Sequence, residues 1–307
     1  MSARLRWWAP RIGLATVIPV VLLAGLLASG ARGGPGIRLG KSVVQIHRVA
    51  DAHFNPGDGK PVFVLIIGND ARPGDTQSRG DALHLIGVNP TTGQATILNI
   101  PRDTWMNIPG HGFDKINAGF ADGGPIPQAK AVSALVGVDI PWVITTGFDG
   151  FQQMVDDLGG VDVNVPFAMA DSDSGAYFDP GPNHFLGGEA LAFSRDRHFD
   201  GGDLVRTQDQ ALVIMAGLAK LRAAGPSEAN TVKWLSVLLK SATFDGGSIP
   251  DLYRLARLAL SIDPNNVRSV VMPAEIGSVG DASVVFATPA AQPLFADFRD
   301  DAVLENS

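Results

Sequence analysis

The feature that most constrains the fold is an uninterrupted apolar run at residues 61–68, PVFVLIIG. Its length suits a strand, and it has no charged position, which is typical of a strand buried at the centre of a sheet. Two more strand-like runs, 81–88 and 95–100, flank the turn sequence NPTTGQ and predict a hairpin beside it.

The rest of the chain alternates between strand-like and helical patterns. Expected helices cover 126–137, 149–160, 203–224, 231–242 and 249–260, with another after Pro289, and expected strands cover 141–148, 161–166 and 267–273. Alternation of this kind is typical of α/β proteins, and the hairpin makes the sheet mixed. The sequence therefore predicts a three-layer α/β/α sandwich with a mixed central sheet.

The N-terminus carries a different signal. Residues 12–31 form a stretch of 20 residues without a charge. Roughly 20 apolar residues span a bilayer core, whereas the apolar region of a cleaved signal peptide is shorter. The sequence favours a transmembrane anchor at 12–31, with a cleaved signal as the alternative. Arginines within 1–11 favour a cytoplasmic N-terminus and an extracytoplasmic domain on a single-pass membrane protein.

Residues 32–60 are expected to form a linker and an edge strand (42–49), and residues 61–307 a single domain. Beyond residue 32 the chain has 20 basic and 31 acidic side chains, a net charge of −11. So negative a domain is not a general polyanion binder, and nucleic acid is excluded as a partner. Cysteine is absent, which excludes disulfides and thiolate chemistry.

One polar loop combines acids with arginines. Residues 68–81 read GNDARPGDTQSRGD and follow the apolar strand. Asp70 and Asp81 stand at strand ends, where open α/β sheets hold ligands, and two such carboxylates suit Mg²⁺, with Mn²⁺ as an alternative. The competing interpretation is ordinary turn chemistry, which is preferred for Asp75.

Basic side chains recur at three later places. Arg102 follows the strand 95–100, Lys115 and Asn117 are expected to open a helix, and 194–198 is expected to be extended with Arg195 and Arg197 on one side. Asp203, Arg206 and Gln210 would share one face of the helix that starts at Asp203. Arginine grips phosphate oxygens through paired charged hydrogen bonds, so such residues suit a pyrophosphate. For any one of these residues taken singly, an ordinary solvated ion pair is the preferred interpretation.

Seven motifs in order resemble the LytR–CpsA–Psr family of envelope proteins. They are IGNDAR (67–72), SRGDAL (78–83), NIPRDT (99–104), KINAGF (115–120), GFDGFQQMVDDLGGVDVNVP (147–166), LGGEALAFSRDRH (186–198) and GGDLVRTQDQ (201–210). Four positions depart from the pattern: Gly80 and Phe120 replace a frequent serine and tyrosine, and Asp209 and Ala211 replace an arginine and a glutamine.

The resemblance implies a phosphotransferase in cell-wall assembly. Such proteins move a polyprenyl-pyrophosphate-linked glycopolymer onto a peptidoglycan hydroxyl and release polyprenyl phosphate. It implies that Asp70 and Asp81 bind Mg²⁺. The resemblance further implies that the catalytic residues are Arg79, Arg102, Arg195, Arg197 and Asp203. It implies that the substrate-binding residues are Arg72, Lys115, Asn117, Arg206 and Gln210.

Some alternatives remain open from sequence. Asp203 or a substrate phosphate would accept the proton of the incoming hydroxyl. Leu212, Val213 and Met215 would line a lipid groove or belong to the ordinary core, and the core is preferred. Two other functions fit the same residues, namely a non-catalytic module that binds polyprenyl (pyro)phosphate and a lipid pyrophosphatase.

Overall fold

The structure is a computed structural model that describes residues 37–38, 44–69, 79–196, 203–223, 225 and 227–305. Only the backbone is described for residues 37–38, 203–205 and 237–241. The predicted anchor at 12–31 lies outside these ranges. Within them, every helix is too short or too polar to cross a membrane.

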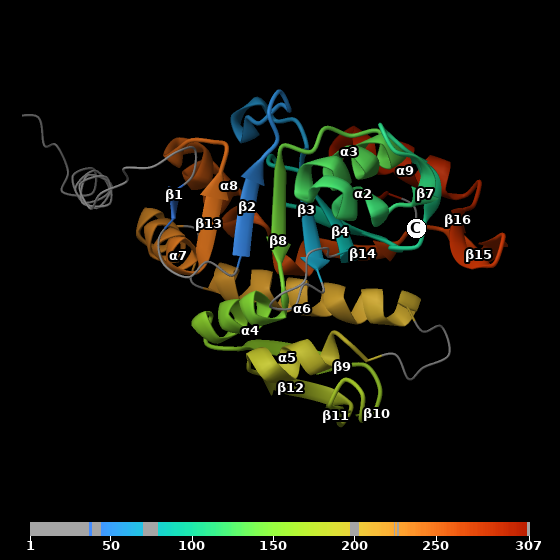
Figure 1. Cartoon of the computed structure of the whole chain (residues 1–307). Helices are drawn as coiled ribbons and strands as arrows, with labels where there is room; N and C mark the ends of the chain where they lie inside the picture. The colour runs from blue at the N-terminus through green and yellow to red at the C-terminus, as the bar shows by residue number, and fades with distance from the viewer. Residues whose placement is uncertain are drawn as a thin grey trace, which may run out of the picture.

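A mixed sheet of eight strands forms the centre of the molecule (Figure 1). Its order is β1-β13-β2-β8-β3-β4-β5-β14. The strands are β1 (Ile37–Arg38), β2 (Val44–Arg48), β3 (Val62–Asn69), β4 (Gly80–Val88), β5 (Ala95–Ile100), β8 (Trp142–Thr146), β13 (Ala242–Asp245) and β14 (Val267–Val271). The predicted central strand is confirmed, because β3 lies between β8 and β4, and the predicted hairpin is the antiparallel pair β4–β5.

Helices cover the sheet on both faces because its strands are apolar on both sides. On one face, Phe63, Leu65 and Ile67 of β3 pack against α2 (Ala118–Gly123), α3 (Pro125–Val136) and α9 (Ala291–Asp301). On the other, Val62 and Val64 belong to a core shared with α6 (Asp203–Ala223), α7 (Glu228–Ser241) and α8 (Ile249–Ser261). Alternating side chains of one strand thus belong to two separate cores.

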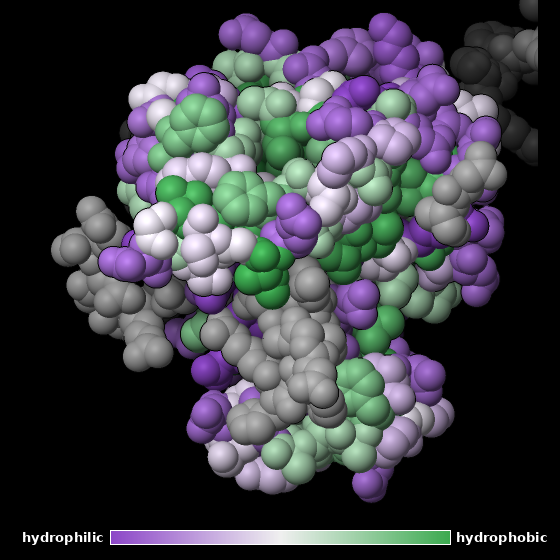
Figure 2. Space-filling view, turned by 90° about the vertical axis from the view of Figure 1, so that its right-hand side faces the viewer, coloured by the Kyte–Doolittle hydropathy of each residue, from purple (hydrophilic) through white to green (hydrophobic). Residues whose placement is uncertain are grey.

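A smaller lobe adjoins the sheet below α6. It contains α4 (Phe148–Asp157), α5 (Gly187–Phe193), and the two-stranded sheets of β9 (Val161–Val165) with β12 (Gly181–Phe185) and β10 (Met169–Asp171) with β11 (Ala176–Phe178). Its core is a third cluster around Phe185 and Phe193. Figure 2 shows this lobe as a protrusion below the main body.

The structure corrects two sequence predictions about the sheet. The strand predicted as an edge, β2, is interior, because β13 pairs with it in parallel and β1 extends the sheet further. The predicted strand 161–166 is present as β9 but belongs to the small lobe instead of the central sheet. The sequence also did not predict the hairpins of β6 (Trp105–Ile108) with β7 (Gly112–Lys115) and of β15 (Ala274–Val279) with β16 (Ala282–Ala287).

Candidate active site

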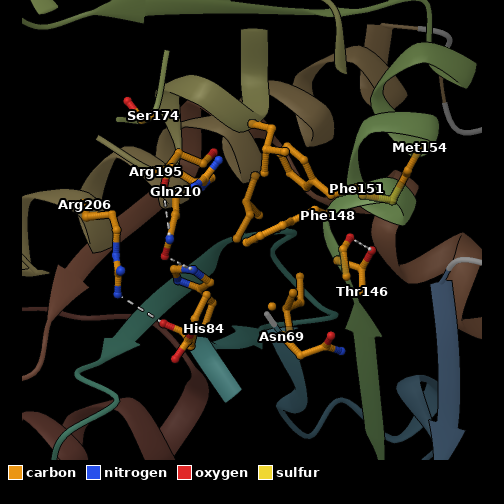
Figure 3. A pocket seen from close by; sticks show the side chains of 18 of the residues that line it. Asn69, His84, Thr146, Phe148, Phe151, Met154, Ser174, Arg195, Arg206 and Gln210 are labelled. Carbon is orange, nitrogen blue, oxygen red and sulfur yellow. Dashed lines mark hydrogen bonds between the residues drawn. The ribbon is translucent and has the colours of Figure 1, made fainter. Parts of the chain in front are cut away.

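A cavity of about 760 Å³ lies between the sheet and the small lobe. It opens at the carboxyl ends of β3 and β8 and the amino ends of β2 and β4, and it is bounded by α4, α5 and α6. Figure 3 shows polar side chains from β4, α6 and the end of α5 on one side and aromatic and apolar side chains of α4 on the other. The cavity therefore has an apolar and a polar wall.

The apolar wall comes from neighbouring strands and one helix. The sheet contributes Val44 of β2, Ile66 of β3 and Ile144 of β8, on the face opposite the core that contains Leu65 and Ile67. Helix α4 contributes Phe151 and Met154. Ile66, Ile144 and Met154 are only partly buried although they sit among core residues. Their remaining exposed area faces the cavity, which suits an apolar occupant.

The polar wall brings together three charged residues. Arg206 of α6 donates from Nη2 to the backbone carbonyl of Asp81 at 3.3 Å. The guanidinium of Arg195, just after α5, lies over the ring of Phe148 with 5.1 Å between its Cζ and the ring centroid. All of these residues line the cavity. Arg195 is exposed whereas Arg206 is 4% exposed, so one arginine is free to adapt to a ligand and the other is held in place.

A chain of ion pairs extends from the polar wall. Arg102 Nη1 lies 2.7 Å from Asp81 Oδ1, and its Nε lies 3.8 Å from Asp103. Lys115 Nζ lies 2.9 Å from the other oxygen of Asp103. Arg102 and Lys115 thus reach the cavity through Asp81 and do not line it. Their pairing orients Asp81 and keeps two cations beside the polar wall.

Lys115 and Asn117 differ from the sequence prediction in local structure. Lys115 is the last residue of β7, not a helix residue, because residues 105–115 form a hairpin. Asn117 is the residue before α2 and is 4% exposed. Its backbone N–H donates to the carbonyl of Arg102 at 3.3 Å, so it ties α2 to the loop that carries Arg102.

Arg195 also departs from expectation. The segment from 194 was predicted to be extended, but Ser194 ends α5 with helical dihedrals, φ −70° and ψ −9°, and residues 194 and 195 form a turn. The Glu189 carboxylate accepts the backbone N–H of Leu186 and favours a helix here, which then runs through Phe193. Arg195 therefore enters the cavity from a turn at the end of a helix.

Several predicted site residues lie outside the described ranges. They are Asp70, Arg72 and Arg197, and for Asp203 only the backbone is described, as the first residue of α6. Arg79 is exposed directly before β4 and does not line the cavity. The remaining predicted residues that line the cavity are Asp81, Arg195, Arg206 and Gln210.

His84 is a cavity residue that the sequence analysis missed. It is 2% exposed and lies with Nδ1 2.7 Å from Asn99 Oδ1 and Nε2 3.2 Å from Gln210 Oε1. Burial lowers the pKa of His84, and the Arg206 cation adds to this, whereas the two hydrogen bonds oppose it. The sequence does contain a signal for this residue, since His84 and Asn99 are polar residues inside two apolar strands. The hairpin register places them opposite each other.

Two buried acids stand behind the polar wall. Asp196 and Asp209 are 1% and 2% exposed. Burial, and secondarily the charge of Asp196, raise the pKa of Asp209 to about 7. Asp209 occupies the position where the resembling family commonly has arginine, so this chain holds a carboxyl group there that is half protonated near neutral pH.

Of the two predicted metal ligands, only Asp81 lies in the part of the chain that the structure describes, and Asp171 and Asp173 also line the cavity. Asp81 is partly exposed at the polar wall, and its Oδ1 is already paired with Arg102. Mg²⁺ prefers oxygen ligands and retains several waters, so one or two carboxylates suffice when phosphate oxygens complete the shell. Across the described ranges, no three His, Asp or Glu side chains form a metal-binding group.

The residues proposed for a lipid groove on α6 are core residues. Val213 is buried in the core of the small lobe and the partly buried Leu212 packs against it, while Met215 packs against the core of the sheet. Ile214, between them, is the residue of this segment that lines the cavity. The preferred sequence interpretation is confirmed for all three.

Comparisons with known proteins agree with the fold. The LytR_cpsA_psr family model matches residues 40–295. The chain is 39% identical over 185 residues to the polyisoprenyl-teichoic acid–peptidoglycan teichoic acid transferase TagU of Oceanobacillus iheyensis, over 58% of this chain and 54% of that protein. It is 37% identical over 163 residues to TagU of Bacillus mycoides, over 52% and 53% of the two chains. The chain thus spans about half the length of these curated relatives.

Solved structures show the same fold. The crystal structure of B. subtilis TagV is similar with a TM-score of 0.67 at 24% identity, over 78% of this chain and 96% of that one. TagT (YwtF) with bound octaprenyl pyrophosphate lipid has a TM-score of 0.63 at 23% identity, over 89% and 98% of the two chains. The protein is a mixed α/β protein, and it belongs to the LytR_cpsA_psr family.

Proposed function

We propose that the protein is a phosphotransferase that moves a glycopolymer from a polyprenyl pyrophosphate carrier to a peptidoglycan hydroxyl, with release of polyprenyl phosphate. The observation that carries the proposal is a single cavity whose apolar wall meets Arg195, Arg206 and Asp81 at its other side. A prenyl chain needs apolar surface, and its pyrophosphate needs concentrated positive charge.

The relatives support this choice of substrate. The names of the TagU relatives give a polyisoprenyl-linked teichoic acid as donor and peptidoglycan as acceptor. The ligand in the TagT structure is a prenyl pyrophosphate. The donor that we propose for the present protein is a lipid-linked glycopolymer.

In the proposed reaction, the acceptor hydroxyl oxygen attacks the phosphorus that bears the glycan, and the bond to the bridging oxygen breaks. A phosphodiester to peptidoglycan forms, and polyprenyl phosphate leaves. Arg195 and Arg206 stabilise charge on the phosphate oxygens, and Arg102 orients Asp81. Arg79 and Arg197 are proposed to add further positive charge. The hydroxyl proton passes to Asp203 or to a substrate phosphate.

We assign Mg²⁺, or Mn²⁺ in its place, to Asp81 together with Asp70. When bound, such an ion would supply positive charge to the phosphate oxygens. We assign Arg72 and Gln210 to substrate binding. Lys115 supports the substrate site through Asp103, and Asn117 supports it through the loop that carries Arg102. An N-terminal helix at 12–31 would hold the domain at the outer surface of the cell membrane, next to its lipid-linked substrate.

The experiment uses the full-length protein in detergent with a labelled prenyl-pyrophosphate-linked glycan. Reactions contain or lack peptidoglycan oligomers, and contain Mg²⁺ or a chelator. We expect polymer transfer and prenyl phosphate release only when the acceptor and the metal are both present. Arg195→Lys should lower the rate about 100-fold, because the loss of a bidentate contact costs roughly 3 kcal/mol. The matched control is Arg254→Lys, at an exposed arginine of α8.

The two alternative functions predict other outcomes. Prenyl phosphate release without acceptor would indicate a lipid pyrophosphatase. Tight lipid binding with no release under any condition would indicate a non-catalytic binding module. Either result contradicts the proposed transfer reaction.

A further inference from the structure

His84 sits between two side-chain amides whose orientations are fixed from outside. Its Nδ1 faces Asn99 Oδ1 at 2.7 Å, and its Nε2 faces Gln210 Oε1 at 3.2 Å. The imidazole forms part of the cavity wall but is itself 2% exposed, so water does not replace either contact freely. The two amides therefore decide which protons the ring carries.

Asn99 offers His84 an oxygen because its nitrogen is used elsewhere. Asn99 Nδ2 donates to Ser269 Oγ at 2.8 Å and to the carbonyl of Val270 at 3.0 Å. A carbonyl can only accept, so reversing the amide would set two oxygens against each other. Asn99 is also completely buried, which leaves the amide no room to turn outward.

Gln210 is held in the same way but less firmly. Its Nε2 donates to the carbonyl of Ser194 at 3.1 Å, and this bond directs Oε1 toward His84. Gln210 is partly exposed to the cavity and has one such anchor where Asn99 has two. Ser194 immediately precedes Arg195, so the amide of Gln210 supports the turn that carries this arginine.

Two acceptors on two ring nitrogens require two N–H donors, and only the imidazolium has both. A neutral ring makes one of the two bonds. The contact to Asn99 is the shorter one, and two hydrogen bonds hold the Asn99 amide, so this bond persists. The neutral ring therefore carries its proton on Nδ1. The lone pair on Nε2 then faces Gln210 Oε1, and the amide of Gln210 is released from Ser194 or turned.

The surrounding charges set when the ring gains its second proton. Charged residues surround His84 on several elements and on the cavity wall. They are Asp81 on its own strand, Arg206, Asp209 and Asp203 on α6, Arg195 and Asp196 after α5, Arg268 on β14, and Asp171 and Asp173 at the end of β10 and just after it. Burial lowers the pKa of His84, and Arg206 lowers it further. An anion bound beside Arg206 would offset that cation and favour the imidazolium.

We propose that His84 is a positioning residue that takes up a proton when an anionic head group binds beside Arg206, and thereby locks Gln210 onto the Ser194 carbonyl and fixes Arg195 at the polar wall. The inference rests on the proposed function for the nature of the anion, a pyrophosphate. It does not require that transfer take place.

The first test observes the ring directly. The full-length protein is labelled with ¹⁵N-histidine, and the nitrogen signals of His84 are assigned with a His84→Gln variant. At pH 8 without ligand, we expect protonated Nδ1 and bare Nε2. Saturating inorganic pyrophosphate should protonate both nitrogens. A ring protonated on Nε2 alone, or one that pyrophosphate leaves unchanged, would overturn the proposal.

The second test measures pyrophosphate affinity from pH 5.5 to 8.5. The titration of pyrophosphate is common to all proteins and cancels in the ratio of affinities. We expect the ratio of wild type to His84→Gln to fall about fivefold or more as pH rises, which corresponds to an ordinary coupling between two sites. His47→Gln is the matched control, since His47 lies on β2 of the same sheet and does not line the cavity.

Each outcome decides between the possibilities. A constant ratio for His84→Gln, or no measurable pyrophosphate binding, contradicts the coupling. If His84→Gln fails to fold, the nitrogen signals of the wild-type protein decide alone, with assignment by His47→Gln and the remaining histidines. Coupled proton uptake without any transfer reaction would refute the proposed function and leave the role of His84 standing.

Discussion

The two faces of the central sheet contain the same kinds of residue but are used differently. On one face, Phe63 and Phe298 meet with their ring centroids 5.2 Å apart, and Leu65 and Ile67 are completely buried. On the other, Ile66 and its neighbours border a cavity of about 760 Å³. Adjacent residues of β3 thus belong to a closed core and to an open site.

The difference shows how one strand serves stability and binding at once. The closed face gains the dispersion contacts of a fully packed interior. The open face forgoes part of them and also carries buried polar groups such as His84 and Asp209. Substitutions on the closed face should therefore change folding, and those on the open face should change binding first.

The largest effect is expected from Phe298→Ala. Phe298 is completely buried in the closed core, and truncating such a side chain costs about 3–5 kcal/mol. Phe151→Ala, at the cavity, is the control and should cost clearly less while it weakens prenyl pyrophosphate binding. Urea unfolding of the two variants measures the difference. Equal losses of stability would remove the distinction between the faces.

Asp209→Asn should change the pH dependence of stability. The pKa of Asp209 is raised to about 7, so the folded state binds its proton more tightly than the unfolded state does. The tighter proton binding stabilises the folded state fully below about pH 4, and this stabilisation is lost as pH rises through 7. The variant should therefore be more stable than wild type at pH 8 by roughly 2–4 kcal/mol, and similar at pH 4.

Urea unfolding of Asp209→Asn and wild type at both pH values gives the comparison. Asp281→Asn, at an exposed acid in the turn between β15 and β16, is the control. Parallel pH profiles for Asp209→Asn and wild type would mean that Asp209 ionises normally in the folded protein.

Enlarging two adjacent residues of β3 compares the faces within one strand. Ile67→Trp overfills the closed core and should cost about 1–3 kcal/mol. Ile66→Trp extends into the cavity, so its stability should remain near that of wild type while prenyl pyrophosphate binding is lost. Thermal unfolding and lipid binding are measured on each. A stable Ile67→Trp, or an unfolded Ile66→Trp, contradicts the assignment of the two faces.

The smallest effect is expected from Gln128→Leu on α3. Gln128 is completely buried, and its amide makes no hydrogen bond with the part of the chain that the structure describes. Burying an unsatisfied polar group costs about 1 kcal/mol or more, so leucine should stabilise the protein by about that amount. A destabilised variant would show that this amide has a partner on the closed face.

The sequence predicts those parts of the fold whose signal is local. The apolar run of β3, the hairpin β4–β5 and the long helices follow from periodicity and turn residues. The order of the strands does not follow from such local signals. Strand β13 has four residues and directly follows α7, so neither its length nor a turn sequence predicts it. Its pairing nevertheless makes β2 an interior strand.

The candidate site was predictable to a similar degree. Motifs led to Asp81, Arg195, Arg206 and Gln210, which the fold brings to one cavity. The turn at Arg195 depends on where α5 ends, and the contact between His84 and Gln210 joins residues 126 apart through the packing of α6 on the sheet. Such contacts have no local pattern. The roles of Asp70, Arg72 and Arg197 remain predictions.

The start of the sheet limits how far the domain can lie from a bilayer. Strand β1 begins at Ile37 on the outer edge of the sheet, and Val44, the first residue of β2, already lines the cavity. If residues 12–31 cross the membrane, six peptide steps separate the lipid from Ile37, a reach of at most about 20 Å. A prenyl carrier would then need to leave the bilayer only partly for its pyrophosphate to meet the arginines.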